Sequence, residues 1–353
     1  MGMGIMIIAD PIYRIIEVDD KLKPIIDSKA FQRLRYIKQT ALTYLAYPSM
    51  NHTRFEHSLG VYYLTKLLAN QLDLDTTYYS LVGLLHDIGH CPFSHTGEMA
   101  LQKYLNKNHE ELSYYWLETL KEEIESLGYT INEIYKGIIG ENIVTFSLGT
   151  DRLDYLQRDS YYSANGNPNI NYHYVIKNIV KIDNTYAFRE KALSLIEQIL
   201  ILRSHLRKTV YFHKSSLAGD VLLERAITKL LDYYKPMEIA LMNDYELVGL
   251  FKYYKIGEWE RIENRDLPKL LAKYNEENED LEEQLEKSNI NYYKIRIVSK
   301  NKIEDIKIYD NEIKPITEVS QVAKYLEYID NQLYGYYYFV DRKDWQKALK
   351  LIQ

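Results

Sequence analysis

The stretch that decides the fold reads Leu84-Leu85-His86-Asp87-Ile88-Gly89-His90-Cys91-Pro92-Phe93-Ser94-His95. His86 and Asp87 directly follow an apolar run, which predicts that this imidazole and this carboxylate lie at the end of a buried helix. A neutral imidazole nitrogen and an ionised carboxylate oxygen together suit a first-row divalent metal. Buried His-Asp pairs are also common as structural hydrogen bonds, so the pair by itself leaves both interpretations open.

Two further segments supply residues that complete a metal site. His57 lies upstream in Thr53-Arg54-Phe55-Glu56-His57-Ser58-Leu59-Gly60, and Asp151 lies downstream in Gly149-Thr150-Asp151-Arg152-Leu153-Asp154-Tyr155. A mixed nitrogen and oxygen set of this kind leaves coordination positions for water and substrate. We therefore predict one divalent ion (manganese, iron, nickel, zinc or magnesium) held by His57, His86, Asp87 and Asp151.

The order His, His-Asp, Asp is the signature of the HD phosphohydrolase superfamily, which this chain resembles. Within that superfamily the N-terminal half looks like the deoxynucleoside triphosphate triphosphohydrolases (dNTPases). The matching text lies at residues 10–13, 31–39, 54–61, 92–95, 109–110 and 151–159, and weaker matches continue through residues 211–214. The resemblance implies hydrolysis of a deoxynucleoside triphosphate (dNTP) to deoxynucleoside and triphosphate.

Composition narrows the class of protein. A chain of 353 residues can bury a large core. The net charge of -6 argues against a general nucleic-acid binder, although a local basic pocket would be enough for a small polyanion. The single cysteine excludes an intramolecular disulfide, and no apolar run approaches the roughly 20 residues of a membrane span. We expect a cytoplasmic protein.

The hydrophobic period changes along the chain. Residues 20–230 are predicted to be mainly helical, with the longest helix at 192–209 and short strands at 5–9 and near 186–188. An acidic stretch at 275–286 is predicted to be a solvated helix or a linker. Beyond it we predict strands at 292–298, 306–309, 313–316 and 336–340, and helices at 319–329 and 345–352. The predicted architecture is mainly α: an HD-domain helical bundle (residues 1–285) with a small C-terminal α+β lobe (residues 286–353).

Several polar residues near the dyad are candidates for catalysis. His90 follows His86 by four positions and would share its helix face if that helix continued. His95 follows the turn at Cys91-Pro92. The resemblance implies that His95 acts near the leaving group and that His90, His109 and Glu110 order water and substrate. Glu98 stands where the family has Asp, so its carboxylate is one methylene longer and its role is left open.

The substrate implied is a triphosphate, whose charge must be neutralised in the transition state. The candidate cations are Arg54, Arg152, Arg203 and Lys214. The alternative for each is an ion pair at the surface or between helices. A Walker-type glycine loop is not present in the sequence, which argues against an ATP-driven machine.

Sugar recognition is assigned through the resemblance. Asp151, Tyr155 and Asp159 are spaced by four and share one helix face. The resemblance assigns Asp159 to the sugar 3′-hydroxyl, Tyr155 and Tyr211 to packing on the sugar, and Gln39 to a position near it. Thr40 and Phe212 depart from the family's Leu and Gln, which leaves base and sugar specificity open.

The sequence also leaves open how the protein is regulated and whether it has another function. Asp27 and Arg35 fall where the family binds an activating guanine nucleotide; the alternative is a surface ion pair. Family enzymes often form symmetric assemblies, so we expect a homo-oligomer. Other possible functions are hydrolysis of another phosphate ester by the same centre, and nucleotide sensing without turnover. A sensor would be expected to have lost a ligand or His95, and none is lost.

Overall fold

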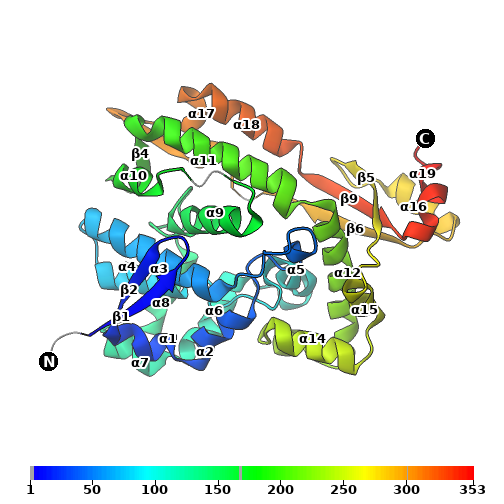
Figure 1. The fold of residues 1–353 in the computed structure, drawn as a ribbon, viewed down its shortest axis with the longest axis horizontal. Coiled ribbons are helices and arrows are strands. Elements are labelled where there is room, and N and C mark those ends of the chain that lie inside the picture. The colour runs from blue at the N-terminus through cyan, green and yellow to red at the C-terminus, as the bar shows by residue number, and fades with distance from the viewer. Residues whose placement is uncertain (1–3, 167–168, 300) are drawn as a thin grey trace.

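The computed structural model describes residues 4–166, 169–299 and 301–353. It shows an elongated molecule with a helical body at the N-terminal end and a three-stranded sheet at the C-terminal end (Figure 1). The prediction of a mainly α fold with small sheets is confirmed. Among the described residues, no helix combines the length and the apolar character that a membrane-spanning segment requires.

Three helices form the centre of the body and carry the motif residues: α3 (Arg54–Gln71), α4 (Thr76–Leu85) and α9 (Thr150–Ser163). Helix α3 begins with a capping box in which Thr53 and Glu56 satisfy each other's backbone N–H groups. Helix α4 begins at Asp75, whose side chain accepts a hydrogen bond from the N–H of Tyr78. Both α4 and α9 pack against α3, so the C-terminal end of α4 and the first turn of α9 meet beside it.

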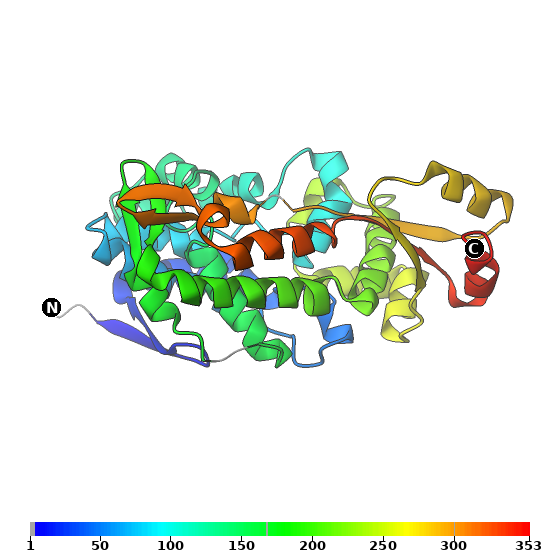
Figure 2. The ribbon, with the colours of Figure 1, turned by 90° about the horizontal axis from the view of Figure 1, so that it is seen from above.

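The other α-helices pack around these three or lie farther along the molecule, toward the C-terminal sheet (Figure 1). They are α1 (Lys23–Ile26), α2 (Lys29–Gln32), α5 (Ser94–Leu105), α6 (His109–Glu118), α7 (Lys121–Ser126), α8 (Ile131–Ile139), α10 (Tyr172–Lys177), α11 (Leu193–Leu206), α12 (Lys214–Leu230), α13 (Pro236–Ala240), α14 (Asp244–Tyr253), α15 (Gly257–Glu263), α16 (Glu279–Lys287), α17 (Ile316–Val319), α18 (Gln321–Asn331) and α19 (Trp345–Leu349). Helix α11 lies alongside α18 (Figure 2). The predicted helix at 192–209 is interrupted, because a π-helical turn over Arg207–Tyr211 follows α11.

A β-hairpin precedes the helices. Strands β1 (Ile5–Asp10) and β2 (Arg14–Asp19) pair antiparallel, which confirms the strand predicted at residues 5–9. The Asp10 side chain accepts hydrogen bonds from the N–H groups of Ile12 and Tyr13 and so holds the turn. Ile16 and Val18 are buried in the main core, which fixes the hairpin against the helical body.

Two sheets join distant parts of the chain. Strands β3 (Ile179–Ile182), β4 (Thr185–Arg189), β7 (Lys307–Asp310) and β8 (Glu312–Pro315) form one sheet in that order, with β4 and β7 parallel. Strands β5 (Lys269–Tyr274), β9 (Gly335–Val340) and β6 (Tyr292–Ile297) form the other. The strands predicted after residue 290 are therefore confirmed. Each sheet contains strands from both sides of residue 285, and the boundary predicted there stays a prediction.

Candidate metal centre and adjoining histidine cluster

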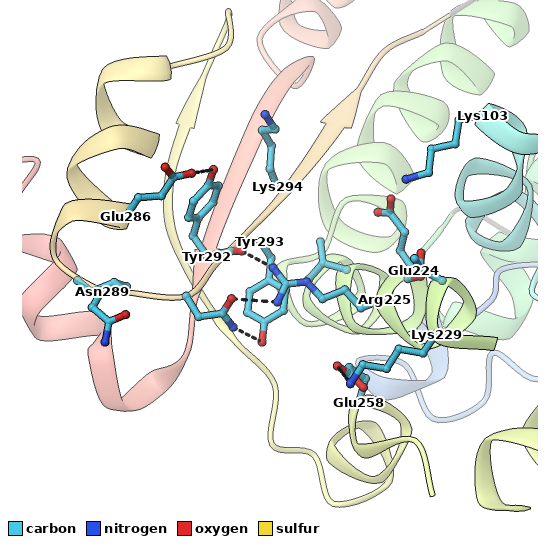
Figure 3. A pocket seen from close by; sticks show the side chains of 14 residues that line it. Lys103, Glu224, Arg225, Lys229, Glu258, Glu286, Asn289, Tyr292, Tyr293 and Lys294 are labelled. Carbon is cyan, nitrogen blue, oxygen red and sulfur yellow. Dashed lines mark hydrogen bonds and ion pairs between the residues drawn. The ribbon is translucent and has the colours of Figure 1, made fainter. Parts of the chain in front are cut away.

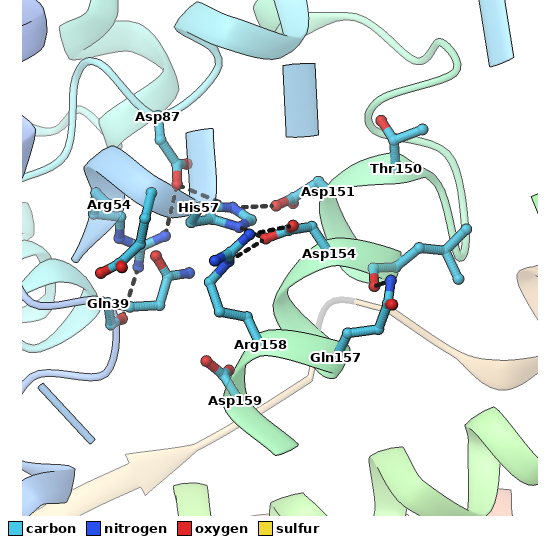
Figure 4. A network of polar contacts seen from close by, with 12 residues as sticks. Gln39, Arg54, His57, Asp87, Thr150, Asp151, Asp154, Gln157, Arg158 and Asp159 are labelled. Carbon is cyan, nitrogen blue, oxygen red and sulfur yellow. Dashed lines mark hydrogen bonds and ion pairs between the residues drawn. The ribbon is translucent and has the colours of Figure 1, made fainter. Parts of the chain in front are cut away.

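Four side chains from three segments of the chain converge between α3, α4 and α9. Figure 4 shows three of them, His57, Asp87 and Asp151. His57 comes from α3, His86 and Asp87 directly follow α4, and Asp151 lies in the first turn of α9. The Nε2 atoms of His57 and His86 lie 3.0 and 3.2 Å from Asp151 Oδ1. Both Nε2 atoms also lie 3.4 Å from an oxygen of Asp87. The structure thus brings all four predicted ligands together.

The other ring nitrogen of each imidazole has a fixed partner. His57 Nδ1 lies 2.7 Å from Asp154 Oδ1, and His86 Nδ1 lies 2.7 Å from the carbonyl oxygen of Gly83. An Nδ1–H group that donates to such an acceptor leaves the Nε2 lone pair for a ligand. Two imidazole nitrogens and carboxylate oxygens then face one position, so the residues present fit a divalent ion, and His57, His86 and Asp87 could hold one.

The negative charge of the carboxylates in this cluster favours the binding of a cation. Burial would lower the pKa of His57, but hydrogen bonds with Asp151 and Asp154 raise it to about 10. Burial would raise the pKa of Asp87, but the charges of His86 and Arg54 hold it well below its ordinary value. The carboxylates are therefore ionised near neutral pH, and in the protein alone a proton on His57 supplies positive charge. A divalent ion at the same place would supply it instead.

Arg54 lies inside the protein, only 4% exposed. Its guanidinium donates to Asp87 Oδ2 at 2.8 Å, to Ser94 Oγ at 3.0 Å and to the carbonyl oxygen of Gln39 at 3.1 Å. These contacts join the metal cluster to the turn before α5.

That turn has two residues in the left-handed region, Phe93 at φ 56° and Ser94 at φ 53°. Such a conformation persists in bulky residues only where the surroundings enforce it. Here the N–H of Phe93 donates to Asp244 Oδ1 at 2.6 Å, and Ser94 Oγ donates to the carbonyl oxygen of Lys38 at 2.6 Å. The turn directs α5, and with it His95, past the metal cluster.

A second cluster contains His90, His95, Glu98 and His109. Helix α4 ends at Leu85, so His90 does not share a helix face with His86; it reaches the first cluster from a turn instead, with Nε2 3.3 Å from Asp87 Oδ1. Glu98 Oε2 lies 3.2 Å from His95 Nδ1 and 3.0 Å from His109 Nδ1. The rings of His90 and His109 stack with their centroids 3.9 Å apart.

The members of the second cluster differ in the direction of their pKa shifts. Burial would raise the pKa of Glu98, but hydrogen bonds from His109 and His95 lower it. Burial and the charges of Arg54 and His109 lower the pKa of His90 well below its ordinary value, so His90 is neutral. Burial would lower the pKa of His109, but its hydrogen bond with Glu98 and the charges of Glu98, Asp87 and Glu110 raise it. The side chain of His95 is 67% exposed.

The face of α9 that follows Asp151 carries the two residues predicted for the sugar. Asp159 is 2% exposed and has a partner on each oxygen: His52 Nε2 at 2.6 Å from Oδ1, and the Tyr211 hydroxyl, which donates to Oδ2 at 2.6 Å. The ring of Tyr155 lies 6.5 Å from that of His57. The structure therefore joins Asp159 and Tyr211 directly and holds Tyr155 beside the metal cluster.

The remaining predicted cations differ in their surroundings. Arg203 is 5% exposed, and its pKa is lowered to about 10 by burial and by the charge of Arg207, with a smaller contribution from Arg152. Arg152 donates to the carbonyl oxygen of Phe146 at 2.9 Å. Arg203 also donates to the carbonyl oxygen of Asn301 at 3.0 Å, and Arg207 pairs with Asp330 at 2.9 Å. Lys214 is exposed at the start of α12.

The positions predicted for an activating nucleotide lie on the surface. Asp27 and Arg35 are both exposed, and no ion pair joins them in the described part of the chain. Arg35 donates to Gln32 Oε1 at 2.7 Å and lies 3.7 Å over the ring of Phe55. The alternative of an ion pair between these two residues is thus not found, and the nucleotide site stays a prediction.

An open groove of about 940 Å³ lies away from both clusters, between α12 and the start of β6 (Figure 3). Arg225 donates to Asn291 Oδ1 at 3.0 Å and lies 3.8 Å over the ring of Tyr293. Lys229 pairs with Glu258 at 2.7 Å. Because these charges are satisfied within its walls, we interpret the groove as a joint between the helical body and the C-terminal sheet.

Three residues of the site were missed in the sequence. Asp154 follows Asp151 by three positions and shares its helix face, a spacing that could have indicated it. His52 and Asp244 have no local signal, because their partners Asp159 and Phe93 lie far away in the chain.

With this geometry established, the chain can be compared with known proteins. Residues 54–159 match the HD domain family, and residues 170–322 match the HD associated region. The chain therefore belongs to the HD-domain superfamily and to its dNTPase-like branch.

Individual relatives show the same likeness. An uncharacterized protein of Methanocaldococcus jannaschii is 34% identical over 76% of this chain and 60% of its own length. Human deoxynucleoside triphosphate triphosphohydrolase SAMHD1 is 30% identical over 64% of this chain and 45% of its own length. This chain thus spans only part of these curated relatives. The crystal structure of a hypothetical protein from Aquifex aeolicus is 28% identical, with a TM-score of 0.82 over 99% of this chain and 100% of that one.

Proposed function

We propose that this chain is a metal-dependent phosphohydrolase that converts a dNTP and water to a deoxynucleoside and inorganic triphosphate. One observation carries the proposal: a second cluster, made of histidines and a glutamate, adjoins the metal cluster. His90 links the two, because its Nε2 lies 3.3 Å from Asp87 and its ring stacks on His109. A site that contains both clusters can bind a phosphate ester at the metal cluster and protonate the leaving group from the second cluster.

His57, His86, Asp87 and Asp151 would hold the ion. When bound, a divalent ion neutralises phosphate charge and increases the acidity of water. Arg203 and Arg152 lie on the α9 side of this site and would neutralise the rest of the triphosphate. Lys214 is a further candidate for the same charge, and Arg54 would act through Asp87.

The adjoining cluster is suited to a basic leaving group. When water adds to the α-phosphorus, the bond to the 5′-oxygen breaks, and that oxygen must take up a proton to leave as a hydroxyl group. Glu98 holds His95 through Nδ1, so the free Nε2 is the atom that would give the proton. The water oxygen stays on the triphosphate. Attack at the γ-phosphorus releases a far less basic diphosphate and would not need this acid.

The sugar would lie against α9. Asp159 would accept from the 3′-hydroxyl, and Tyr155 and Tyr211 would pack on the ring. The side chain of Gln39 leaves its Oε1 buried without a protein partner, which suits a ligand hydroxyl. The Thr40 hydroxyl is likewise buried without a protein partner among the described residues.

A product assay tests the reaction. Metal-loaded protein is incubated with each dNTP and each ribonucleotide in ¹⁸O-labelled water, and nucleoside, nucleotide and phosphate products are separated. We expect deoxynucleoside and labelled triphosphate. Labelled orthophosphate with a nucleoside diphosphate would refute the proposed reaction. Cleavage of another phosphate ester, or binding without turnover, would favour the two rival functions. Self-association, an activating nucleotide and a cytoplasmic location stay predictions.

A further inference from the structure

Asp154 is a buried carboxylate, and each of its two oxygens has two hydrogen-bond partners. It is 0% exposed. Its Oδ1 lies 2.7 Å from His57 Nδ1 and accepts from Arg158 Nε at 3.0 Å (Figure 4). Its Oδ2 accepts from Arg158 Nη2 at 3.1 Å and from the Tyr13 hydroxyl at 2.7 Å. The carboxylate is therefore fixed in both position and rotation.

Two of the residues that donate to Asp154, Arg158 and Tyr13, are connected through Asp10 in the β1–β2 hairpin. Arg158 also donates from Nη1 to Asp10 Oδ2 at 2.8 Å. The other oxygen of Asp10 holds the backbone of the β1–β2 turn, and Tyr13 extends from that turn. The hairpin, which is distant from α9 in sequence, thus supplies both a charge partner for Arg158 and a hydroxyl for Asp154.

One position of α3, Gly60, leaves space for the Asp154 carboxylate and the Arg158 guanidinium. Gly60 lies one turn after His57, and a Cβ atom there would lie 1.9 Å from Asp154 Oδ2 and 2.5 Å from Arg158 Nη2. A glycine at this position therefore lets the carboxylate approach the helix closely enough to reach His57. Stability alone is a weak reason for such a network, because an apolar cluster of similar volume is often as stable as buried ion pairs.

We propose that Asp154 is a positioning residue for the metal centre and that Tyr13 of the hairpin holds it there. By accepting the Nδ1–H of His57, Asp154 fixes the tautomer and the ring orientation in which Nε2 faces the ion. Tyr13 and Arg158 keep that acceptor from turning away. The proposal rests on the metal centre in the proposed function, but it does not depend on which phosphate ester is cleaved.

Metal affinity tests the proposal without any substrate. Chelator-treated protein is titrated calorimetrically with Mn²⁺ and with Zn²⁺, and urea unfolding of each metal-free variant is measured in parallel. Asp154→Asn keeps the size of the side chain but can present an NH₂ group to His57. We expect its metal affinity to fall on the order of 10- to 100-fold, the usual effect of removing the partner of a ligating histidine. Tyr13→Phe removes one of four donors and should weaken binding by a smaller factor.

Tyr63 provides a matched control. Its ring lies 4.5 Å from that of Tyr13, but its hydroxyl contacts His173 at 3.1 Å and not Asp154. Tyr63→Phe should leave metal affinity unchanged. The same loss in Tyr13→Phe and Tyr63→Phe would overturn the proposal, as would an Asp154→Asn protein that folds and binds both ions normally.

The outcomes separate this proposal from the proposed function. If Asp154→Asn does not fold, the comparison of Tyr13→Phe with Tyr63→Phe decides. A wild-type protein that binds neither ion refutes the metal centre and this proposal together. Normal metal binding with cleavage at another bond refutes the proposed reaction alone.

Discussion

Replacing Gly60 with alanine tests how rigid the network beneath the metal centre is. On an exposed helix face, Gly→Ala stabilises a protein by about 1 kcal/mol. At Gly60 the added Cβ would lie 1.9 Å from Asp154 Oδ2, well inside contact distance, so the carboxylate must move away from Arg158 and His57. Breaking a buried ion pair costs roughly 3–5 kcal/mol. We therefore expect Gly60→Ala to reduce the free energy of unfolding by about 2–4 kcal/mol.

The assay is urea unfolding of Gly60→Ala beside Gly249→Ala. Gly249 lies on the exposed side of α14, and an added Cβ there meets nothing within 4 Å. This control should raise the free energy of unfolding by about 0.5–1 kcal/mol. The reasoning is refuted if Gly60→Ala is as stable as the control. The Asp154 carboxylate could then move at no cost in free energy, and it would not hold the His57 ring in place.

Three further outcomes are expected. Burial raises the pKa of Asp220, which accepts from Thr96, to about 7 from its ordinary 3.8, so the folded protein retains a proton that the unfolded chain releases. Stability should therefore fall as pH rises from 4 to 7, and in urea unfolding the advantage of Asp220→Asn should grow from near zero at pH 4 to at most about 4 kcal/mol at pH 8. His52→Ala should raise KM for the nucleotide on the order of tenfold with little change in kcat, because Asp159 loses the hydrogen-bond partner of its Oδ1; an effect on kcat alone would contradict this. Arg203→Gln should raise KM for a triphosphate more than for a monophosphate in steady-state kinetics, and equal effects would exclude a phosphate contact.

Three of the four candidate metal ligands could be predicted from a local signal. His86 and Asp87 end an apolar helix, and Asp151 opens another with Tyr155 and Asp159 on the same face. The family order of these residues added His57. Spacing along a helix is short-range information, so it predicts which side chains share a face but not what they meet across the core.

The residues that were missed depend on long-range contacts. His52 pairs with Asp159 across 107 positions, and Tyr13 reaches Asp154 across 141. The same limit applies to the sheets: the alternating period predicted the strand at residues 336–340, but nothing local pairs β9 with β5 as well as β6. The end of α4 at Leu85 does agree with the sequence, because the apolar run stops there and the polar residues His86 and Asp87 follow.

The two histidine clusters differ in their electrostatics, and His90 links them. The acidic groups around His57 raise its pKa, so that cluster attracts a cation. In the other cluster Glu98 contacts both His95 and His109, and hydrogen bonds from these two residues lower the pKa of Glu98 although burial would raise it. His90 contacts Asp87 on one side and His109 on the other, and the charge of Arg54 helps to keep it neutral. A neutral His90 adds no positive charge between the residues proposed to hold the ion and His95, the proposed acid.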